Sequence, residues 1–313
     1  MQANDGLTRW ADQSTDRSTR STSQTIVNRF TGNRADTATD NLAVEEPLEL
    51  QLAYGPMASR QVKSISVTMR TPGDDFELVA GFLLTEGMVS DSADISKISY
   101  ITGPRNEIQS TAAALKTILP YQSERNVVRV ELAPDVAVST ANLERNFYTT
   151  SSCGICGKAS LLALRTVCPP RTANTLKVPV GLLYSLPGRL RGEQEVFERT
   201  GGLHASGLFD SEGRLQSIRE DVGRHNAVDK LMGAEFLANR TPLRDRILFL
   251  SGRASFELLQ KALMSGIPMV VSVGAPSSLA VKVAKEFDIT LIGFLRGDHL
   301  NVYHGAERIF TSG

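Results

Sequence analysis

The chain has 313 residues, of which 41% are hydrophobic, enough to form one large domain or two medium ones around a packed core. Its 34 basic and 34 acidic residues balance, so the composition favours neither nucleic acid nor an anionic membrane as the main partner. No run of 18 apolar residues is present and residues 1–30 carry no apolar signal segment, so we expect a cytoplasmic protein without a membrane span.

The N-terminal region is dominated by Ser, Thr, Asp, Arg and Asn. Such a composition cannot bury enough apolar surface to offset the entropy lost on ordering, so residues 1–41 are predicted to be a disordered tail. Order is expected to begin at residues 42–55, LAVEEPLELQLAYG, where apolar residues approach the alternation of a half-buried strand. Residues 64–70, SISVTMR, repeat this pattern and predict a second strand.

A helix is predicted over residues 74–87 by five apolar residues on one helical face: Phe76, Val79, Ala80, Leu83 and Leu84. Asp74, followed three positions later by Glu77, is predicted to cap this helix, and Gly87 to end it. A strand over residues 126–132 and a short helix near residues 139–147 complete a predicted N-terminal α+β domain, residues 42–148.

Strands alternate with helices in the second half of the chain. Strands are predicted over residues 204–209, 215–220, 246–250, 268–273 and 289–296. Helices are predicted over residues 223–240, 255–266 and 277–287. This order indicates an α/β fold with parallel pairings, in which a mixed sheet with flanking helices forms a C-terminal domain over residues 171–313.

Two of the three cysteines, Cys153 and Cys156, form a C-x-x-C within the segment TTSSCGICGKAS, residues 149–160. A structural zinc site needs two further ligands, and the sequence has no second close pair of Cys or His. A thioredoxin-like motif needs a strand in front of it; residues 157–167 predict the following helix, but no preceding strand is evident.

The surroundings of the C-x-x-C therefore favour a reactive thiol pair. The predicted helix N-terminus and Lys158 both favour the thiolate of Cys156, and the neighbouring glycines leave the sulfur atoms unshielded. Residues 149–170 are accordingly predicted to be a mobile cysteine loop and helix. Cys168, after an apolar helix and before two prolines, is expected in the core or a linker.

A zinc deaminase would carry H-x-E followed by P-C-x-x-C. Here His204 is followed by Ala205 and Ser206, so the general acid/base Glu is missing, and the C-x-x-C precedes the histidine. Catalytic deamination is therefore not expected, although the element order is compatible with a deaminase-like scaffold.

The segment REDVGRHNAVDK, residues 219–230, places many charged and polar side chains at one strand–helix junction. A solvated helix start explains part of this charge. It explains less well why Arg224, His225 and Asn226 gather beside Gly223, a pattern that favours an anion pocket at a helix N-terminus.

Two further loops, SGRASFE and GAPSSLAV, each follow an apolar strand and precede a helix. Their small residues leave backbone N–H groups free to meet phosphate, although neither matches an established nucleotide-binding motif. Two such loops at adjacent strand ends predict a phosphorylated or nucleotide-bearing ligand at the carboxyl edge of the sheet. The residues expected there are Ser251, Gly252, Arg253, Ser277 and Ser278.

The segment GFLRGDH, residues 293–299, ends the last long predicted strand. Phe294 could stack on a base, Arg296 could pair with phosphate, and Asp298 could accept hydrogen bonds from a purine edge. Together with His204, Arg224 and His225, these residues extend the predicted ligand site.

The ordered series of motifs resembles the formate dehydrogenase accessory sulfurtransferase family, FdhD, from about residue 44 to the C-terminus. The segments that carry the resemblance are MRTPGDDFELVAGFLLTEG, SSCGICGKAS, TGGLHASGLF, REDVGRHNAVDKLMG, SGRASFELLQKA, GIPMVVSVGAPSSLAV and TLIGFLRG. The resemblance implies a cytoplasmic, usually dimeric protein with a deaminase-like C-terminal domain. It also implies that sulfur is taken as a persulfide from a cysteine desulfurase and passed to the molybdenum (or tungsten) cofactor carrying guanine dinucleotides, before that cofactor enters the formate dehydrogenase catalytic subunit.

By the same resemblance, Cys153 is the persulfide carrier and Cys156 its companion. The cofactor-binding stretch of the family falls on Phe294, Leu295, Arg296, Gly297, Asp298 and His299. No zinc, nucleic acid or membrane partner is expected. Two other hypotheses stay open: a chaperone that holds the cofactor without covalent sulfur chemistry, and a zinc-dependent hydrolase.

Overall fold

The computed structural model of the protein describes residues 21–101, 125–136, 138, 164–165, 168 and 173–311. Within these ranges, no helix combines the length and the apolar character needed to cross a bilayer. The predicted helix near residues 139–147, most of the one over residues 157–167, and the predicted domain boundaries near residues 148 and 170 lie outside the described residues.

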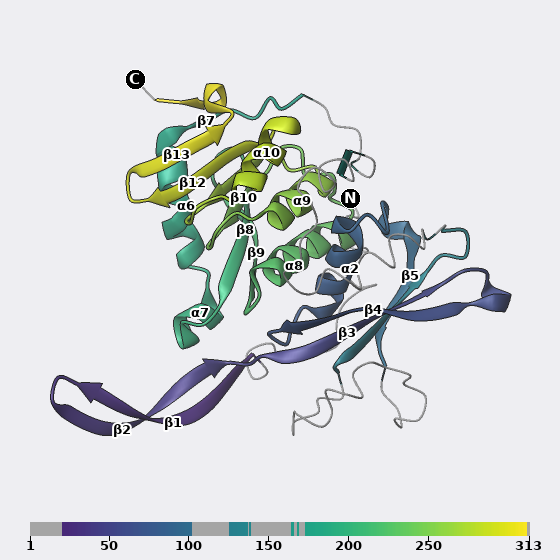
Figure 1. The fold of residues 1–313 in the computed structure, drawn as a ribbon, viewed down its shortest axis with the longest axis horizontal. Coiled ribbons are helices and arrows are strands. Elements are labelled where there is room, and N and C mark those ends of the chain that lie inside the picture. Colours follow the sequence, from purple (N-terminus) through teal and green to yellow (C-terminus); the bar gives the residue numbers. More distant parts are fainter. Residues whose placement is uncertain are drawn as a thin grey trace, which may run out of the picture.

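A β-hairpin arm formed by β1 (Thr22–Thr31) and β2 (Arg34–Ala43) projects away from the body of the protein (Figure 1). The prediction of a disordered tail is therefore wrong for residues 22–41, whereas residues 1–20 lie outside the described part of the chain. β1 is rich in Thr, Ile and Val, which favour strands, and Gly32 (φ 58) supplies the positive φ of the two-residue turn. Local turn chemistry thus outweighs the polar composition here.

The N-terminal lobe is a four-stranded sheet with strand order β4-β3-β6-β5. Its strands are β3 (Glu46–Tyr54), β4 (Gln61–Arg70), β5 (Ile95–Tyr100) and β6 (Val127–Leu132), with short 3-10 helices at Met57–Ser59 and Ser92–Asp94. Alternate residues of β3, Leu48, Leu50 and Leu52, share one hydrophobic cluster with residues of helix α2 (Asp75–Thr85). The alternation of β3 thereby places its apolar face against the helix.

The start of α2 differs from the prediction. Asp74 occupies the N-cap position, but its backbone is left-handed (φ 56) and its side chain does not cap the helix. Instead, both carboxylates pair with Arg219 of the neighbouring lobe, which lies 2.5 Å from Glu77 and 3.7 Å from Asp74. The helix ends as predicted before Gly87, which has φ 70.

The C-terminal lobe contains a six-stranded mixed sheet with strand order β13-β12-β11-β10-β8-β9, which confirms the predicted α/β class. The strands are β8 (His204–Phe209), β9 (Leu215–Asp221), β10 (Ile247–Leu250), β11 (Met269–Ser272), β12 (Thr290–Arg296) and β13 (His299–His304). As predicted, the central strands β10, β11 and β12 run parallel. The short strands β7 (Val178–Pro179) and β14 (Ile309–Phe310) form a separate parallel pair, next to a 3-10 turn at Ala306–Arg308.

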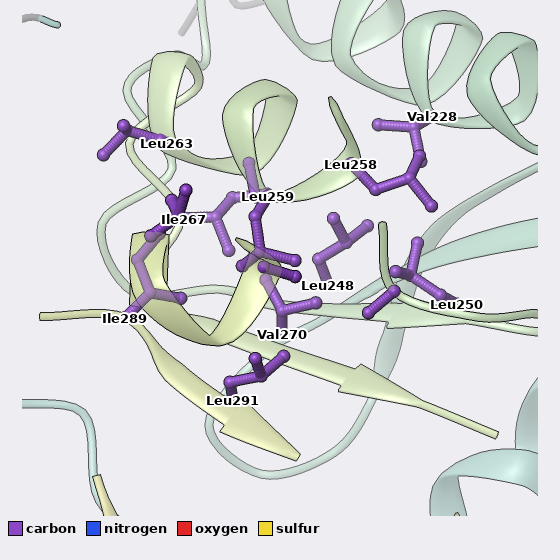
Figure 2. Close-up of a cluster of buried hydrophobic side chains, with 14 of the residues drawn as sticks. Val228, Leu248, Leu250, Leu258, Leu259, Leu263, Ile267, Val270, Ile289 and Leu291 are labelled. Carbon is purple, nitrogen blue, oxygen red and sulfur yellow. The ribbon is translucent and has the colours of Figure 1, made fainter. Parts of the chain in front are cut away.

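Helices cover both faces of this sheet (Figure 1). Helices α8 (Arg224–Leu237), α9 (Phe256–Met264) and α10 (Ser278–Glu286) lie on one side, and α6 (Val180–Arg191) lies on the other, followed by the short α7 (Glu195–Thr200). In Figure 2, Leu248, Val270 and Leu291 of the strands face the leucines of α9, and all are buried. Because both faces are covered, the central strands are nearly continuous apolar runs.

Helix α8 joins the two lobes. Its Phe236 and Leu237 belong to the hydrophobic cluster of the N-terminal sheet, while its Val228 and Leu231 belong to that of the C-terminal sheet. Gly81 of α2 and Gly233 of α8 face each other so closely that a Cβ on either would lie 1.8 Å from a backbone oxygen of the other helix. Only glycine allows this approach, so α2 and α8 pack backbone to backbone where the two lobes meet.

Candidate functional site

The predicted site residues come together at one edge of the six-stranded sheet. The parallel strands β10, β11 and β12 all end at this edge. β8 runs antiparallel to β10 and therefore begins there with His204, whose register partner Asp221 ends β9. Helix α8 starts three residues after Asp221, which brings its first turn to the same place.

Backbone contacts link the loops of this edge into a continuous row. Ser251 Oγ accepts a hydrogen bond from Ala205 N at 2.9 Å, next to His204. Gly274 N donates to Gly252 O at 3.0 Å, and Phe294 N donates to Gly274 O at 3.2 Å. The three predicted loops are therefore neighbours in space.

Glycines in these loops make room for close approach. A Cβ on Gly252 would lie 3.3 Å from Nδ1 of His204, and one on Gly274 would lie 2.9 Å from Cγ of Arg253. The His204 ring and the Arg253 stem thus pack directly on backbone that has no side chain. A side chain at either glycine would push these neighbours away, so the two glycines keep the loops of this edge close together.

The first turn of α8 carries Arg224 and His225. His225 Nε2 lies 3.3 Å from Ser255 Oγ and 3.9 Å from Glu257 Oε2, so it bridges α8 and the start of α9. Arg224 Nε is buried and has no hydrogen-bond partner among the described residues. A buried guanidinium donor without a partner at a helix N-terminus is suited to an anionic ligand.

Two histidines of the site, His204 and His225, are kept neutral by their surroundings. Burial lowers the pKa of His204, and the positive charge of Arg224 lowers it further. Burial, with the charges of Lys261 and Arg224, lowers the pKa of His225 to about 4. Neutral imidazoles can donate or accept a hydrogen bond, so the positive charge of this corner comes from Arg224 and the helix N-terminus.

The β12–β13 hairpin extends the site beyond the sheet edge. Phe294 adopts φ 54 at an irregularity in the β12–β13 register, and its side chain is 36% exposed. Arg296 pairs with His299 across a turn formed by Gly297 and Asp298, and these four residues are exposed. The turn therefore presents an aromatic ring, a cation and a carboxylate within six residues.

Two predicted residues have other roles in the structure. Leu295 is 1% exposed and belongs to the hydrophobic cluster under α6, so its assignment to the ligand site is corrected to a core position. Ser277 caps α10 by accepting a hydrogen bond from Ala280 N at 3.1 Å, so its hydroxyl is already engaged, whereas Ser278 is exposed.

Cys153 and Cys156 lie outside the described residues. Cys168 is half-buried and packs against the hydrophobic cluster of the C-terminal lobe, which confirms its predicted place in the core or a linker. In the part of the chain that the structure describes, no three His, Cys, Asp or Glu side chains are placed to hold a metal ion together.

The site is backed by three buried polar residues: Asp221, Asn226 and Lys230. Asn226 was expected beside an anion pocket, but a buried network of the three residues was not predicted. All three lie in the crowded segment at residues 219–230. That crowding was the available signal, but the partners of these residues are in the N-terminal lobe, about 150 positions away in the chain.

Comparison with known proteins identifies the family. A sequence model of the FdhD/NarQ family matches residues 43–310, most of the chain. The chain belongs to the FdhD/NarQ family. Members similar to it include proteins named sulfur carrier protein FdhD from Streptomyces coelicolor, 49% identical over 93% of this chain and 96% of that protein, and from Mycobacterium tuberculosis, 49% identical over 90% and 96%.

A solved structure agrees with this fold. A crystal structure described as that of a formate dehydrogenase accessory protein from Desulfotalea psychrophila aligns with 92% of this chain and 99% of that chain, at a TM-score of 0.65 and 23% identity. This likeness concerns the fold alone. A guanine deaminase from Nitrosomonas europaea aligns with 48% of this chain at a TM-score of 0.27, which is too low to support an argument.

Proposed function

We propose that this protein is a sulfur carrier for formate dehydrogenase. It receives sulfur as a persulfide from a cysteine desulfurase and passes it to the molybdenum (or tungsten) cofactor that carries guanine dinucleotides, before the catalytic subunit takes up that cofactor. The observation that supports this most is the gathering of an anion-binding corner and an exposed aromatic hairpin at one sheet edge, in a family whose relatives are named sulfur carrier proteins. A homodimer is part of the proposal.

The site offers groups suited to a guanine nucleotide. The first turn of α8 with Arg224, and the loops after β10 and β11, are suited to the pyrophosphate, because helix N-termini and backbone amides bind phosphate oxygens. The exposed ring of Phe294 is suited to stacking on the base. The Asp298 carboxylate would accept from the N–H groups of the guanine edge, which adenine lacks.

The sulfur step needs only thiols. The thiolate of Cys153 attacks the outer sulfur of the desulfurase persulfide, a new S–S bond forms, and the desulfurase cysteine leaves as a thiolate. The loaded Cys153 persulfide then transfers its outer sulfur to a nucleophilic atom of the acceptor, which supplies the electron pair of the new bond, while the S–S bond breaks and Cys153 leaves as the thiolate. Cys156, three residues away in the sequence, can accept that sulfur by the same exchange, or release it as sulfide by forming a disulfide with Cys153 that a further thiol then reduces.

Mass spectrometry of the protein after incubation with a cysteine desulfurase and cysteine tests the sulfur step. We expect a peptide spanning residues 153–156 to gain about one sulfur atom. Cys168→Ala serves as the matched control, because this third cysteine packs against the core, and the variant should load like the wild type. An adduct confined to Cys168, or no adduct at all, would contradict the proposal.

A non-covalent chaperone is the alternative, and the cysteines distinguish the two. In a host that lacks the natural protein, Cys153→Ala combined with Cys156→Ala should yield inactive formate dehydrogenase if sulfur is carried. Full activity with the double variant would favour the chaperone. The single variants assign the roles: Cys153→Ala should abolish transfer, and Cys156→Ala should slow it.

Calorimetry with nucleotides tests the ligand. Guanosine diphosphate should bind and adenosine diphosphate should not, since a site built to hydrogen-bond the guanine edge leaves its polar groups unpaired with adenine. Asp298→Asn keeps the shape of the side chain but replaces one acceptor oxygen by an N–H donor. The variant should therefore show a smaller ratio between the dissociation constants for adenosine diphosphate and guanosine diphosphate. Equal affinity of the wild type for both nucleotides would contradict this part of the proposal.

A further inference from the structure

The polar residues behind the site form a buried network that crosses between the lobes. We propose that Asp221, Asn226 and Lys230 are positioning residues, through which the end of β4 fixes the ligand-binding turn Val222–His225. This inference rests on the proposed function and deepens it, because it names what sets the ligand affinity of that site. None of the three residues needs to touch the ligand.

Asp221 is the centre of this network and is fully buried. Its Oδ1 accepts hydrogen bonds from Gly223 N at 2.8 Å and from Asn226 Nδ2 at 3.0 Å. Its Oδ2 accepts from Thr71 N at 3.1 Å and lies 2.7 Å from Lys230 Nζ. The four donors compensate the buried carboxylate, and three of them, Gly223, Asn226 and Lys230, belong to the turn or the helix that it supports.

The other members attach the network to the N-terminal lobe. Asn226 Nδ2 also donates to Met69 O at 2.7 Å, and Asn226 Oδ1 accepts from Thr68 Oγ1 at 3.1 Å. Lys230 Nζ donates to Thr71 O at 2.8 Å. Thus β4 and the residue after it hold both the asparagine and the lysine of α8.

The same lobe also holds the turn directly. Val222 N donates to Thr71 Oγ1 at 3.2 Å, and Gly223 N is already engaged by Asp221. The turn is therefore fixed from its inner side. The first turn of α8, whose N–H groups have no partner within the helix, follows immediately, with Arg224 and His225 in it.

Asn226→Asp is the most informative variant, because it has a pH-dependent signature. The new carboxylate would lie against the Asp221 Oδ1 atom and the Met69 carbonyl, both of which are acceptors. At pH 7.5 this repulsion should open the turn and raise the dissociation constant for guanosine diphosphate at least tenfold. At pH 5.5 protonation of the new side chain restores a donor, and the deficit relative to wild type at the same pH should shrink to threefold or less.

Matched variants separate positioning from general destabilisation. Glu235→Gln removes a buried charge at the other end of α8, where Glu235 pairs with Arg240 at 2.6 Å, and it should leave the dissociation constant unchanged. Thr71→Val removes only the hydroxyl that holds Val222 N, and it should weaken binding threefold to tenfold. Thr71→Val also decides the matter if Asn226→Asp does not fold. Wild-type affinity of folded Asn226→Asp at both pH values, or of folded Thr71→Val, would overturn the proposal.

Amide hydrogen exchange of the ligand-free protein separates this proposal from the proposed function. Exchange at residues 222–225 should be faster in Asn226→Asp and Thr71→Val than in wild type, and unchanged in Glu235→Gln. If wild type does not bind guanosine diphosphate, the proposed ligand is wrong. The exchange rates alone then test whether the network holds the turn. Unchanged exchange in the two network variants would then overturn it.

Discussion

Phe294 has a left-handed backbone conformation, which costs a residue with a side chain about 1–3 kcal/mol. Strain of this kind tends to be retained where it serves a site, and here it accompanies an exposed ring at the sheet edge that we propose binds an anion. His204 and His225, held neutral by burial and by nearby cations, are a second unusual feature of the same edge. The site thus combines a strained aromatic residue with two histidines that stay uncharged at neutral pH.

The environment of His225 predicts a pH dependence. Its pKa of about 4 in the folded protein lies below the ordinary value of 6.5, so the unfolded chain binds the proton more readily. The stability that depends on neutral His225 should be complete above pH 6.5 and should be lost progressively as the pH falls towards 4. An NMR titration of the imidazole should give a midpoint well below 6.5.

Denaturant unfolding of wild type and His225→Gln between pH 4 and pH 7.5 provides the comparison. The wild type should lose more stability than the variant over this range, because glutamine has no proton to gain. An NMR midpoint near 6.5 would show that the folded protein does not disfavour the charged ring.

At the scale of secondary structure, the crossing of α2 and α8 depends on two glycines. A methyl group on Gly81 or Gly233 would overlap backbone atoms of the opposing helix, which cannot yield as a flexible side chain does. The crossing also lies between two hydrophobic clusters, so a displaced helix would disturb both.

Gly233→Ala should therefore destabilise the protein by about 3 kcal/mol or more, through overpacking. Gly188→Ala is the matched control: this glycine lies in α6 with no atom within 4 Å of an added Cβ, and the change should stabilise by about 0.5–1 kcal/mol through helix propensity. Chemical denaturation of both variants measures the difference. Equal stability of Gly233→Ala and wild type would mean that the helices do not cross this closely.

The elements that the sequence predicted well are those with strong periodicity and glycine boundaries, such as α8 and the strands β10 to β12. Helix α6 was missed, because Pro187 lies inside it and interrupts the helical pattern. Asp74 was misjudged as a cap, because its carboxylate faces Arg219 from the other lobe. Such interlobe contacts are invisible to reasoning about neighbouring residues.

In the candidate site, too, some features could be predicted from the sequence and others depend on contacts between distant residues. Strand order places Ser251, Arg253 and Phe294 at one sheet edge, and the sequence could predict this because parallel strands end together. The core position of Leu295 follows from the strand irregularity at Phe294, and the local sequence pattern does not predict that irregularity. The network of Asp221 could not be predicted, because half of it comes from residues 68–71.

At the scale of the whole molecule, the β1–β2 arm projects away from the two lobes (Figure 1). The base of the arm packs against α7, where Arg199 Nη2 donates to Thr22 Oγ1 at 3.0 Å, and Val44 N donates to Ser21 O at 2.9 Å to join the two ends of the arm. Ile26 and Phe30 are each 75% exposed on one face of the arm. The arm therefore adds little to the core of the protein.

A variant that begins at Val44 should melt within about 4 °C of the full chain, which corresponds to a loss of about 1 kcal/mol. It should also bind guanosine diphosphate as the full chain does, since no arm residue lies in the site. Differential scanning fluorimetry and calorimetry on the two proteins are the measurements. A decrease of 10 °C in the melting temperature would show that the arm unfolds cooperatively with the rest of the protein.

Helix α8 contributes to the hydrophobic clusters of both lobes, and this has a consequence for synthesis on the ribosome. The N-terminal sheet is complete in sequence at Leu132, but Phe236 and Leu237, which close its hydrophobic cluster, are made roughly a hundred residues later. Helix α2 already covers the apolar face of the sheet, but at about 5–20 residues per second the side of α2 that packs against α8 waits roughly 5–20 s for its cover. During that interval the emerging chain is open to aggregation, so its yield in a cell depends on translation speed and on chaperones that hold nascent chains, as well as on the stability of the finished fold.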